Sequence, residues 1–530
     1  MKHITSKWQI LLPLVALGCP ADPATLPTEW SLEPIYGLPN LDGDQGNGRD
    51  WNKASRSDDE NDLSPWSLHE GLLEALDVGQ TLELTLEGDT ANIRLWSGAT
   101  QLLNEEQSAV TLQGNAPTDL AFEFGDFLAT GTLTIEQFTP DGESLQSESM
   151  TLMASPMILN HHLQPVERAY AVEDGLFNQQ MIDTISDIMG NAFRTEDATR
   201  YDYDVWVQDE FETSTLTSPT GRIDLVIDSI RSQGSGLDAF PEDVVATTPD
   251  AFARTWGNGV PNSQDSFGNL EVSPPVTVNG VEYPFGRVYW GKWNGSGPVD
   301  KLANALEDQK VQDPFNLDVT WLCVGHVDEF TTFLPDPDAP KGFRLYVGDA
   351  AEGLAFLDSL DPSLEIPRYA TEHNVSTVGE LQEDAALRAL NEDYQTDWIA
   401  PQIEVMKKRL GLTEDDIVRI PAMYEEHPAC GPYALALFPG TVNMLVITQD
   451  DGSVDAVMPD PFLRGDDDDT RVDPLVARVE ELLPQGVRPH WVDDWRTYHL
   501  MWGEVHCGTN TTRTPNASWW LDAMHLIEEE

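Results

Sequence analysis

The sequence contains few cysteines and few basic residues. Only four cysteines occur in 530 residues, too few for a small scaffold held together mainly by disulfides. Lysine and arginine total 30 against 91 aspartates and glutamates, which gives a formal net charge of −61. Such a surface repels phosphate backbones, so nucleic acid is a poor candidate partner. It attracts cations and basic polypeptides, although adaptation to a salty medium accounts for the charge equally well.

The sequence also lacks an apolar run long enough for a permanent membrane helix. The apolar stretch at residues 10–18 follows Lys2 and Lys7 and predicts a secretory signal over residues 1–18. Residues 16–19, ALGC, are similar to a bacterial lipobox in which Cys19 would be lipidated, although the leucine stands where a small residue is usual. We therefore expect export from a bacterial cell, as a secreted, periplasmic or lipid-anchored protein.

Three cysteines remain if Cys19 is lipidated or removed: Cys323, Cys430 and Cys507. Export would permit a disulfide between two of them. Pairing of Cys323 with Cys430 is one option, and it would leave Cys507 as an unpaired thiol. The sequence does not test whether the Cα atoms of that pair lie close enough for a bond.

The pattern of residues changes along the chain. After a linker at 19–27, residues 28–155 contain short alternating strands, for example at 81–86, 91–96 and 131–135. Turn residues separate these strands at intervals typical of a β-sandwich. The first part of the chain is therefore predicted to be a small all-β domain.

Residues 156–530 mix helical and strand patterns. Apolar residues spaced three and four apart predict helices at 181–189 and 384–412. Short apolar runs predict buried strands at 226–227, 344–347 and 444–447. No clear internal sequence repeat is visible, so periodicity alone indicates only the α/β class.

Three polar clusters, far apart in the sequence, carry reactive side chains: WVQDE at 206–210, GHVDE at 325–329 and GEVHCGTN at 503–510. Together they supply two carboxylates, a histidine and a thiol. Carboxylates can hold a planar cation, a histidine can move protons, and a thiolate can attack carbon. These are the groups needed to hydrolyse a guanidinium. Spacing alone also allows a buried structural thiol and a surface His–Asp pair.

The wording of these clusters resembles the protein-arginine deiminase family. Four blocks carry the resemblance: WVQDEFE at 206–212, DSFGNLEVSPPVTVNG at 265–280, WLCVGHVDEF at 321–330 and GEVHCGTN at 503–510. FPGTVNM at 438–444 and the tryptophan pair at 519–520 extend it over roughly 156–520. The resemblance implies a five-bladed α/β propeller (pentein fold) for the catalytic domain at 156–530. It also implies an immunoglobulin-like β-sandwich at 28–155.

The resemblance implies hydrolysis of peptidyl-arginine to citrulline and ammonia. Asp209 and Asp328 match the family's guanidinium-binding aspartates, His326 matches the general acid and base, and Cys507 matches the nucleophile that forms a thiouronium intermediate. Substrate contacts are implied for Trp206, Arg231, Val324 and His506. A second arginine found in one family member is replaced here by Gln233.

Several Ca²⁺ ions are the cofactor that the resemblance implies. Calcium takes six to eight oxygen ligands. One implied set consists of Gln208, Glu212, Glu271 and the carbonyls of Phe267 and Leu270. A second set consists of Glu210, Asp228 and Ser229. Near the second set, Ser232 replaces the asparagine that is usual in the family. The acidic loop at 40–62 offers a further set: Asn40, Asp42, Asp44, Asp50, Asp58, Asp59 and Asp62. This loop is not an EF-hand, because Gln45 and Trp51 occupy its glycine and twelfth positions.

Two other functions remain open. A hydrolase of free arginine or another small guanidine would use the same four catalytic groups, but the calcium blocks argue against it. A calcium-binding surface or adhesion protein would not need these four groups together. We expect arginine-containing proteins or peptides, mainly basic ones, as substrates. Neither the natural substrate nor the oligomeric state follows from the sequence.

Overall fold

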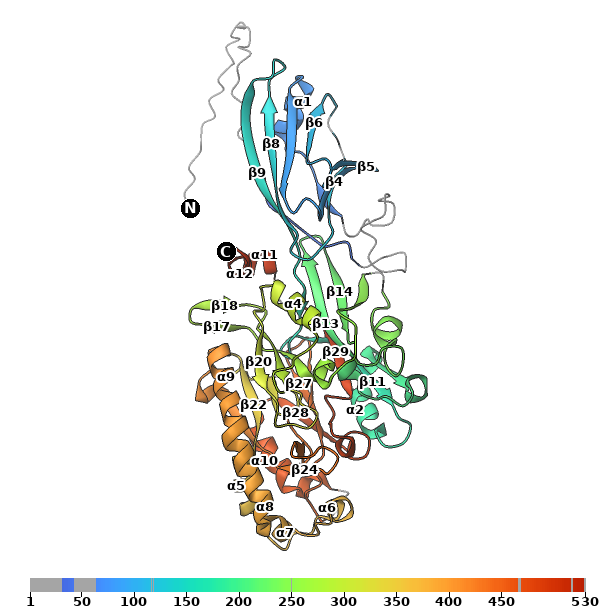
Figure 1. Cartoon of the computed structure of the whole chain (residues 1–530), viewed down its shortest axis with the longest axis vertical. Coiled ribbons are helices and arrows are strands. Elements are labelled where there is room, and N and C mark those ends of the chain that lie inside the picture. Colours follow the sequence, from blue (N-terminus) through green and yellow to red (C-terminus); the bar gives the residue numbers. More distant parts are fainter. Residues whose placement is uncertain are drawn as a thin grey trace, which may run out of the picture.

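The computed structural model describes residues 31–41, 63–115, 117, 119–248, 250–465, 469–515 and 518–528. The predicted signal, Cys19, the linker and most of the acidic loop (Asp42, Asp44, Asp50, Asp58, Asp59 and Asp62) lie outside the described residues. The molecule is elongated, with a β-rich part at one end and a mixed α/β part at the other (Figure 1). Within the described ranges, no helix combines the length and apolar character needed to cross a membrane.

The β-rich part consists of two sheets around one core. The first contains, in spatial order, β1 (Ile35–Gly37), β9 (Ser144–Ala154), β8 (Thr130–Phe138), β3 (Thr81–Gly88) and β6 (Ala109–Gln113); the second contains β2 (Ser64–Trp66), β7 (Leu120–Phe124), β4 (Ile93–Ser97) and β5 (Thr100–Leu103). Leu82 and Leu84 of β3 share a buried cluster with Phe122 and Phe124 of β7. Helix α1 (Glu70–Asp77) adds Leu72 to that cluster. The alternating pattern of the sequence thus corresponds to a two-sheet sandwich.

Within the described α/β part, five sheets share one pairing pattern: a central strand has one antiparallel and one parallel neighbour. The central strands are β11 (Val166–Glu173), β14 (Gly221–Asp228), β19 (Val288–Lys292), β22 (Phe343–Asp349) and β27 (Val454–Pro459). Their antiparallel partners are β29 (Thr509–Arg513), β13 (Phe211–Ser218), β16 (Leu270–Val272), β21 (Thr331–Pro335) and β26 (Leu445–Thr448). Their parallel partners are β12 (Phe193–Asp197), β15 (Ala251–Thr255), β20 (Phe315–Asp318), β23 (Ile417–Pro421) and β28 (Val487–Val492). The sequence showed no repeat, because strand pairing is made by the backbone and does not require matching side chains.

One of these sheets joins segments from opposite ends of the α/β part. Strand β29 lies antiparallel to β11, with Asn510 opposite Tyr170, and the two strands adjoin in Figure 1 despite their distant colours. The segment that precedes β29 is therefore fixed beside the first strands of the α/β part. Short additional strands are β10 (Ile158–Leu159), β17 (Val276–Val278), β18 (Val281–Tyr283), β24 (Tyr424–Glu426) and β25 (Ala434–Ala436).

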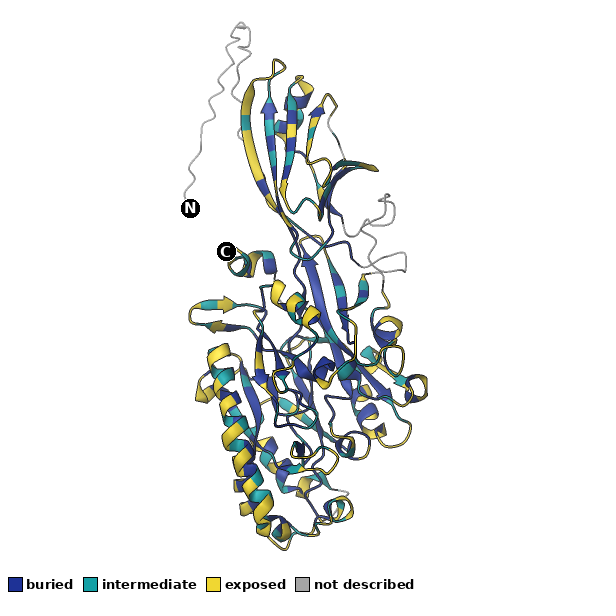
Figure 2. Cartoon of the chain, viewed as in Figure 1, coloured by how far each residue is buried: buried dark blue, intermediate teal, exposed yellow. Residues whose placement is uncertain are grey.

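The two predicted helices are present. Helix α2 (Gln179–Met189) buries Met181, Ile182 and Ile185. The pattern at 384–412 corresponds to α8 (Ala385–Asp393), a π-helical segment (Tyr394–Ile399) and α9 (Ala400–Leu410), which follow one another without a break. The Asp384 side chain caps the start of this run and Gly411, at a φ of 63°, ends it. Its outward face is exposed (Figure 2).

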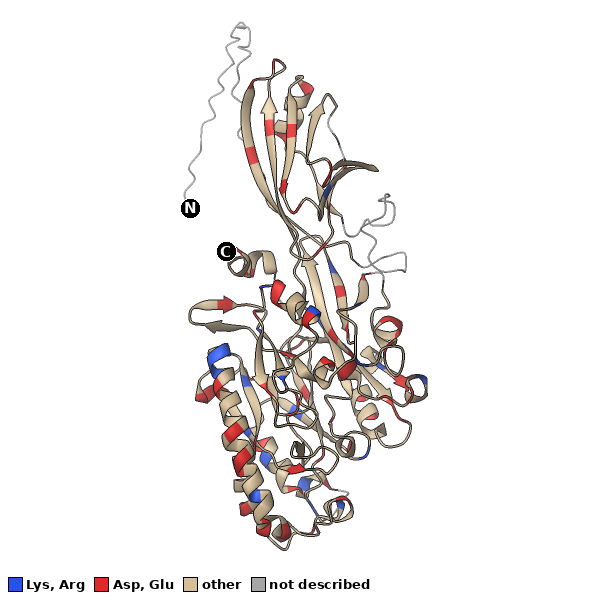
Figure 3. Ribbon diagram, viewed as in Figure 1, with Lys and Arg blue, Asp and Glu red and all other residues tan. Residues whose placement is uncertain are grey.

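The remaining α-helices of the described chain are α3 (Val207–Glu210), α4 (Asp300–Asp308), α5 (Ala350–Ser359), α6 (Pro367–Glu372), α7 (Val378–Glu383), α10 (Pro474–Leu482), α11 (Trp519–Asp522) and α12 (Met524–Ile527). Acidic residues are spread over both parts of the molecule (Figure 3). Both parts therefore contribute to the negative charge.

Candidate active site

Cys507 lies just before β29 and is the free cysteine of the described chain, with 5% of its surface exposed. Its Sγ lies 3.4 Å from Asp328 Oδ2 and accepts a hydrogen bond of 3.3 Å from Asn443 Nδ2. Burial, with the charges of Asp328 and Asp209, raises the pKa of the Cys507 thiol well above its usual value. A cation bound between these groups would favour the thiolate.

Asp209, His326 and Asp328 converge on one backbone position, Gly268. A methyl group on Gly268 would lie 2.7 Å from His326 Nδ1, 3.0 Å from Asp328 Oδ2 and 3.1 Å from Asp209 Oδ1. The Gly268 carbonyl also accepts a hydrogen bond from the Asp328 amide. The glycine thus allows the three side chains to approach one another closely. Asp209 comes from α3, and the other two residues come from the loop before β21.

The protonation of His326 follows from its contacts. Its Nε2 lies 2.8 Å from the Ser263 carbonyl. A carbonyl can only accept, so Nε2 carries a hydrogen. The other nitrogen, Nδ1, faces Asp209 Oδ1 at 3.6 Å. Nδ1 is therefore the nitrogen that can take up or release a proton on the side of the carboxylates.

Each aspartate has one unsatisfied oxygen. Asp209 Oδ1 and Asp328 Oδ1 are buried and have no hydrogen-bond partner among the described residues. Burial raises the pKa of Asp209, and its nearness to Asp328 adds to that effect. An unpaired buried carboxylate is costly, and a donor-rich cation would satisfy both oxygens.

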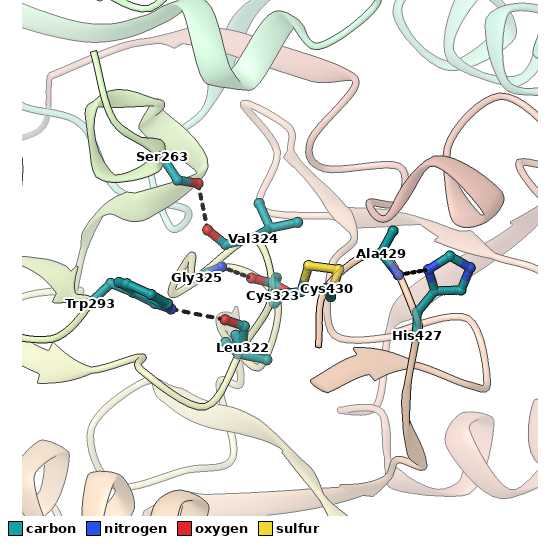
Figure 4. Close-up of a disulfide and its surroundings, with 10 residues drawn as sticks. Ser263, Trp293, Leu322, Cys323, Val324, Gly325, His427, Ala429 and Cys430 are labelled. Atoms are coloured by element: carbon teal, nitrogen blue, oxygen red, sulfur yellow. Dashed lines mark hydrogen bonds between the residues drawn. A yellow bond between two sulfur atoms is a disulfide. The ribbon is translucent and has the colours of Figure 1, made fainter. Parts of the chain in front are cut away.

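The loop that carries His326 is tied to the rest of the fold by a disulfide between Cys323 and Cys430, whose Cα atoms lie 5.7 Å apart (Figure 4). The pairing raised from the sequence is therefore present. Next to it, the Val324 carbonyl accepts a hydrogen bond from Ser263 Oγ. Ser263 thus contacts both the loop and the His326 ring. The amides of Gly325 and His326 both donate to Glu329 Oε1.

Two expected substrate contacts, Trp206 and Arg231, lie near the site with partners of their own. The Trp206 ring packs edge-on against Tyr498, with centroids 5.5 Å apart, and covers Gly503. Arg231 Nη1 lies 3.0 Å from both Asp204 Oδ2 and Glu210 Oε2. Arg231 is thus held by carboxylates, one of which belongs to the second expected calcium set.

The first expected calcium set is gathered in one place. Gln208 Nε2 lies 3.2 Å from Glu212 Oε2 and 3.3 Å from the Phe267 carbonyl. Glu271 follows Leu270 at the start of β16 and lines the same cavity as Gln208 and Glu212. Burial raises the pKa of Glu212 to about 7 and that of Glu271 to about 8. Buried oxygen ligands that resist ionisation without a cation fit a hard divalent ion.

The second expected set is also close together. Glu210 ends α3 directly before Phe211, the strand partner of Asp228, and the Ser229 amide donates to the Glu210 carbonyl at 2.9 Å. Glu210 Oε1 and Asp228 Oδ1 are buried without a hydrogen-bond partner in the described chain. Burial raises the pKa of each carboxyl to about 7. Ser229 Oγ donates to the Asp265 carbonyl, so this hydroxyl is engaged elsewhere.

Asn40 is the described member of the acidic-loop set. It is buried, and its Nδ2 donates to Glu123 Oε1 at 2.9 Å. Its Oδ1 has no hydrogen-bond partner among described residues. The other members of that set lie outside the described residues, so the set stays a prediction.

Four residues of the site were not singled out from the sequence: Ser263, Gly268, Asn443 and His162. Gly268 and Asn443 stand inside the DSFGNLEVSPP and FPGTVNM blocks, and that was the signal that could have found them. Asn443 contacts Cys507 through Sγ and through the Cys507 amide, which donates to its Oδ1 at 3.3 Å. His506, expected to touch substrate, donates through Nδ1 to Asp328 Oδ2 at 2.9 Å. It therefore lies beside one of the two aspartates expected to bind the guanidinium, and its contact with substrate stays a prediction.

Comparison with known proteins gives consistent matches. A profile described as protein-arginine deiminase (PAD) matches residues 144–521. The chain is 33% identical over 423 residues to human protein-arginine deiminase type-1, covering 76% of this chain and 61% of that protein. It is 33% identical over 426 residues to human type-4, with the same coverage, and 36% identical over 333 residues to mouse type-3, covering 60% of this chain and 48% of the relative. The chain thus spans about half to three-fifths of the length of these relatives.

Proposed function

The chain belongs to the protein-arginine deiminase family, and from this premise we propose that it hydrolyses the guanidinium of peptidyl-arginine to citrulline and ammonia. One observation carries the proposal: two buried aspartate oxygens without partners in the described chain lie beside the Cys507 thiol and the His326 ring. A guanidinium presents N–H donors in a planar fork that matches two carboxylates. Its carbon would then face the sulfur.

In the first half of the reaction, Cys507 Sγ attacks the guanidinium carbon as a thiolate. The S–C bond forms, and the carbon becomes tetrahedral. His326 Nδ1 gives its proton to one terminal nitrogen, the C–N bond breaks, and ammonia leaves. A cationic thiouronium remains on Cys507, flanked by Asp209 and Asp328, whose charge stabilises it.

In the second half, water replaces the sulfur. His326 Nδ1, now neutral, takes a proton from the water, which attacks the same carbon. The C–S bond breaks and Cys507 leaves as a thiolate. The remaining proton on the new hydroxyl oxygen passes to the released ammonia or to solvent water, and neutral citrulline is released. The donor Nδ2 of Asn443, 3.3 Å from Sγ, stabilises that anion.

Calcium is the cofactor we assign to the two oxygen sets around α3. Gln208, Glu212, Glu271 and the Phe267 and Leu270 carbonyls would hold one ion, and Glu210, Asp228 and Ser229 a second. A bound cation would neutralise these buried carboxylates and order the helix that carries Asp209. What supports the assignment is that the four buried carboxyls of the two sets have few cationic side chains near them in the described chain: Arg231 beside Glu210, and His506 and Arg513 beside Glu212 and Glu271.

The same premise extends to the architecture. We assign the five sheets to the blades of a pentein propeller, which the β11–β29 pair would close into a ring, and the two-sheet sandwich to an immunoglobulin-like domain at 28–155. Export through the signal at 1–18, with Cys19 as a lipid attachment point, remains part of the proposal. The negative surface supports basic peptides as preferred substrates, because steering raises their encounter rate at low salt.

The test is citrulline formation from a blocked arginine peptide and from free arginine, with calcium and with chelator. The expected result is calcium-dependent turnover of the peptide that is abolished in Cys507→Ala. In Cys430→Ala, which keeps the nucleophile, kcat at saturating peptide should stay near the unmodified value after correction for folded fraction. Turnover of free arginine alone would assign the chain to small guanidines. Tight calcium binding without turnover of either substrate would replace the enzyme by a binding protein.

A further inference from the structure

A second kind of ligand set lies in the cavity behind the nucleophile. His162, Glu271 and His506 are buried, and one ligand atom from each lies within 4.8 Å of the others. His162 Nε2 is 3.8 Å from Glu271 Oε2, and His506 Nε2 is 3.6 Å from Glu271 Oε1. Ligands about 2.0–2.1 Å from a tetrahedral zinc ion lie roughly 3.4 Å apart, so small side-chain shifts would complete the geometry.

Both imidazoles are already oriented by their other nitrogen. His506 Nδ1 bonds Asp328 Oδ2 at 2.9 Å, and His162 Nδ1 lies 3.3 Å from Thr332 Oγ1. Their Nε2 atoms therefore face Glu271. A carboxylate or hydroxyl behind each histidine is the arrangement that fixes ring and tautomer in metal sites.

The space between them suits a single ion. The cavity has a volume of about 30 Å³ and is lined by all three residues together with Gln208, Glu212 and Arg513. With both glutamates ionised and His506 neutral, as a metal ligand must be, two negative charges face the positive charge of Arg513, whose guanidinium donates to the carbonyls of His162, Gln164 and Val446. The cavity therefore retains a net negative charge for a divalent cation.

We propose that a borderline transition-metal ion, represented by Zn²⁺, binds in this cavity through His162 Nε2, His506 Nε2 and Glu271. Nitrogen ligands select such metals over calcium, which prefers oxygen. Glu271 belongs to both sets, so zinc and calcium exclude each other. This exclusion rests on the proposed function, whereas zinc binding itself does not.

The site would also act on the reaction centre. A metal on His506 Nε2 makes that ring a fixed partner of Asp328, which contacts Cys507 Sγ at 3.4 Å. Zinc would therefore hold Asp328 toward His506 and remove Glu271 from calcium. The expected outcome is inhibition that rising calcium relieves.

The first test measures Zn²⁺ binding calorimetrically to the chelator-treated chain in a Cys507→Ser background, which removes the thiol as a ligand. His162→Ala is expected to weaken zinc binding about 100-fold or more, since loss of even an outer-shell partner costs about 10- to 100-fold. His161→Ala is the matched control, because His161 is the neighbouring histidine and is buried, but it lies outside the cluster. It should leave zinc affinity unchanged. Equal zinc affinity in the two variants would overturn the proposal.

A second measurement does not depend on the variants folding. Crystals of the unmodified chain soaked in zinc should give an anomalous peak at the zinc edge between His162 and His506. A peak on Cys507 or on surface carboxylates alone would refute the site. If zinc binds there but the chain makes no citrulline, the proposed function fails while this site stands. If added calcium does not weaken zinc binding, the shared role of Glu271 is wrong.

Discussion

Asn443 is a neutral side chain in direct contact with the thiol. Its Nδ2 donates to Cys507 Sγ and to the Asp328 carbonyl, and it lowers a thiol pKa that burial otherwise raises. We predict that Asn443→Ala lowers kcat roughly 10- to 150-fold, the equivalent of losing about 1.5–3 kcal/mol from a hydrogen bond to a charged group. The pH midpoint of Cys507 alkylation should rise in the same variant, measured with iodoacetamide on chelated protein.

Asn391 provides the control for that variant. It is fully buried and its amide joins α8 to β24 through the Tyr424 backbone, far in sequence from the thiol. Asn391→Ala should reduce thermal stability and leave the alkylation midpoint where it was. If Asn443→Ala also leaves both the midpoint and kcat unchanged, Asn443 only packs beside the sulfur.

Gly268 is needed because of what surrounds it rather than for its backbone angles. A Cβ there would lie 2.7–3.1 Å from His326, Asp328 and Asp209. We predict that Gly268→Ala lowers kcat/KM at least 100-fold, because misplacing reacting groups by about 1 Å has an effect of this size. The circular dichroism spectrum should stay unchanged. The control is Gly465→Ala, which should keep its activity because the nearest atom to the new Cβ would be 3.5 Å away. Near-normal activity of Gly268→Ala would contradict the prediction and show that the three side chains can move to make room for a methyl group.

Among the elements of the fold, the loop before β21 depends on a covalent tie. The Cys323–Cys430 disulfide closes a span of 107 residues, and the Cys323 amide donates to the Ala434 carbonyl at 2.9 Å. We predict that Cys430→Ser lowers the free energy of unfolding by about 2–4 kcal/mol, mainly because the unfolded chain gains conformational entropy when the disulfide is absent. KM should rise as well, because Val324 and His326 lie on the released loop. Guanidinium titration measures the first effect and peptide kinetics the second.

Reduction gives the same comparison without a mutation. A reducing agent should move the unfolding midpoint of the unmodified chain to that of Cys430→Ser and leave the variant unaffected. Cys507→Ser, which keeps the disulfide, should respond to the reductant like the unmodified chain. A midpoint insensitive to reduction would mean that the loop is held by its hydrogen bonds alone.

Local patterns in the sequence predicted those elements whose side chains have a clear period. Helix α2, the α8–α9 run and strands β3 and β8 were expected where they lie, because one face of each is apolar. The five-fold repeat of sheets was invisible, because it exists in backbone pairing. The same limit applies to the site. Distinctive sequence motifs contain the four expected catalytic residues, Asp209, His326, Asp328 and Cys507. His162 lies in no such motif, and only folding brings it close to His506.

For the whole molecule, buried carboxyls make stability depend on pH. Burial raises the pKa of Glu212 to about 7 and those of Glu271 and Glu329 to about 8. Above about pH 4.5 these groups are ionised in the unfolded chain and still protonated in the folded one. The stability they contribute is complete at low pH and is lost as pH rises toward 8. We predict that Tm of chelated protein falls by several degrees between pH 5 and 8.

Calcium should reverse this trend. An ion bound by Glu212 and Glu271 needs both carboxylates ionised, so its stabilising effect grows as pH rises. Thermal unfolding measured across this pH range, once with chelator and once with calcium, tests both the fall in Tm of the chelated protein and its reversal by calcium. Glu329→Gln removes one titrating group outside the calcium sets and should flatten the chelated curve without altering the calcium response. A chelated Tm that rises over this range would contradict the prediction.

The pairing of β29 with β11 has a consequence for synthesis. The ribosome makes the chain in sequence order, so Asp209, His326 and Asp328 are made before Cys507. Strand β29, which follows Cys507 and holds it in place, is made after all four. Under the proposed function, a nascent chain that still lacks Cys507 is inactive toward itself and its neighbours. The site is complete only after β29 has been made and has paired with β11.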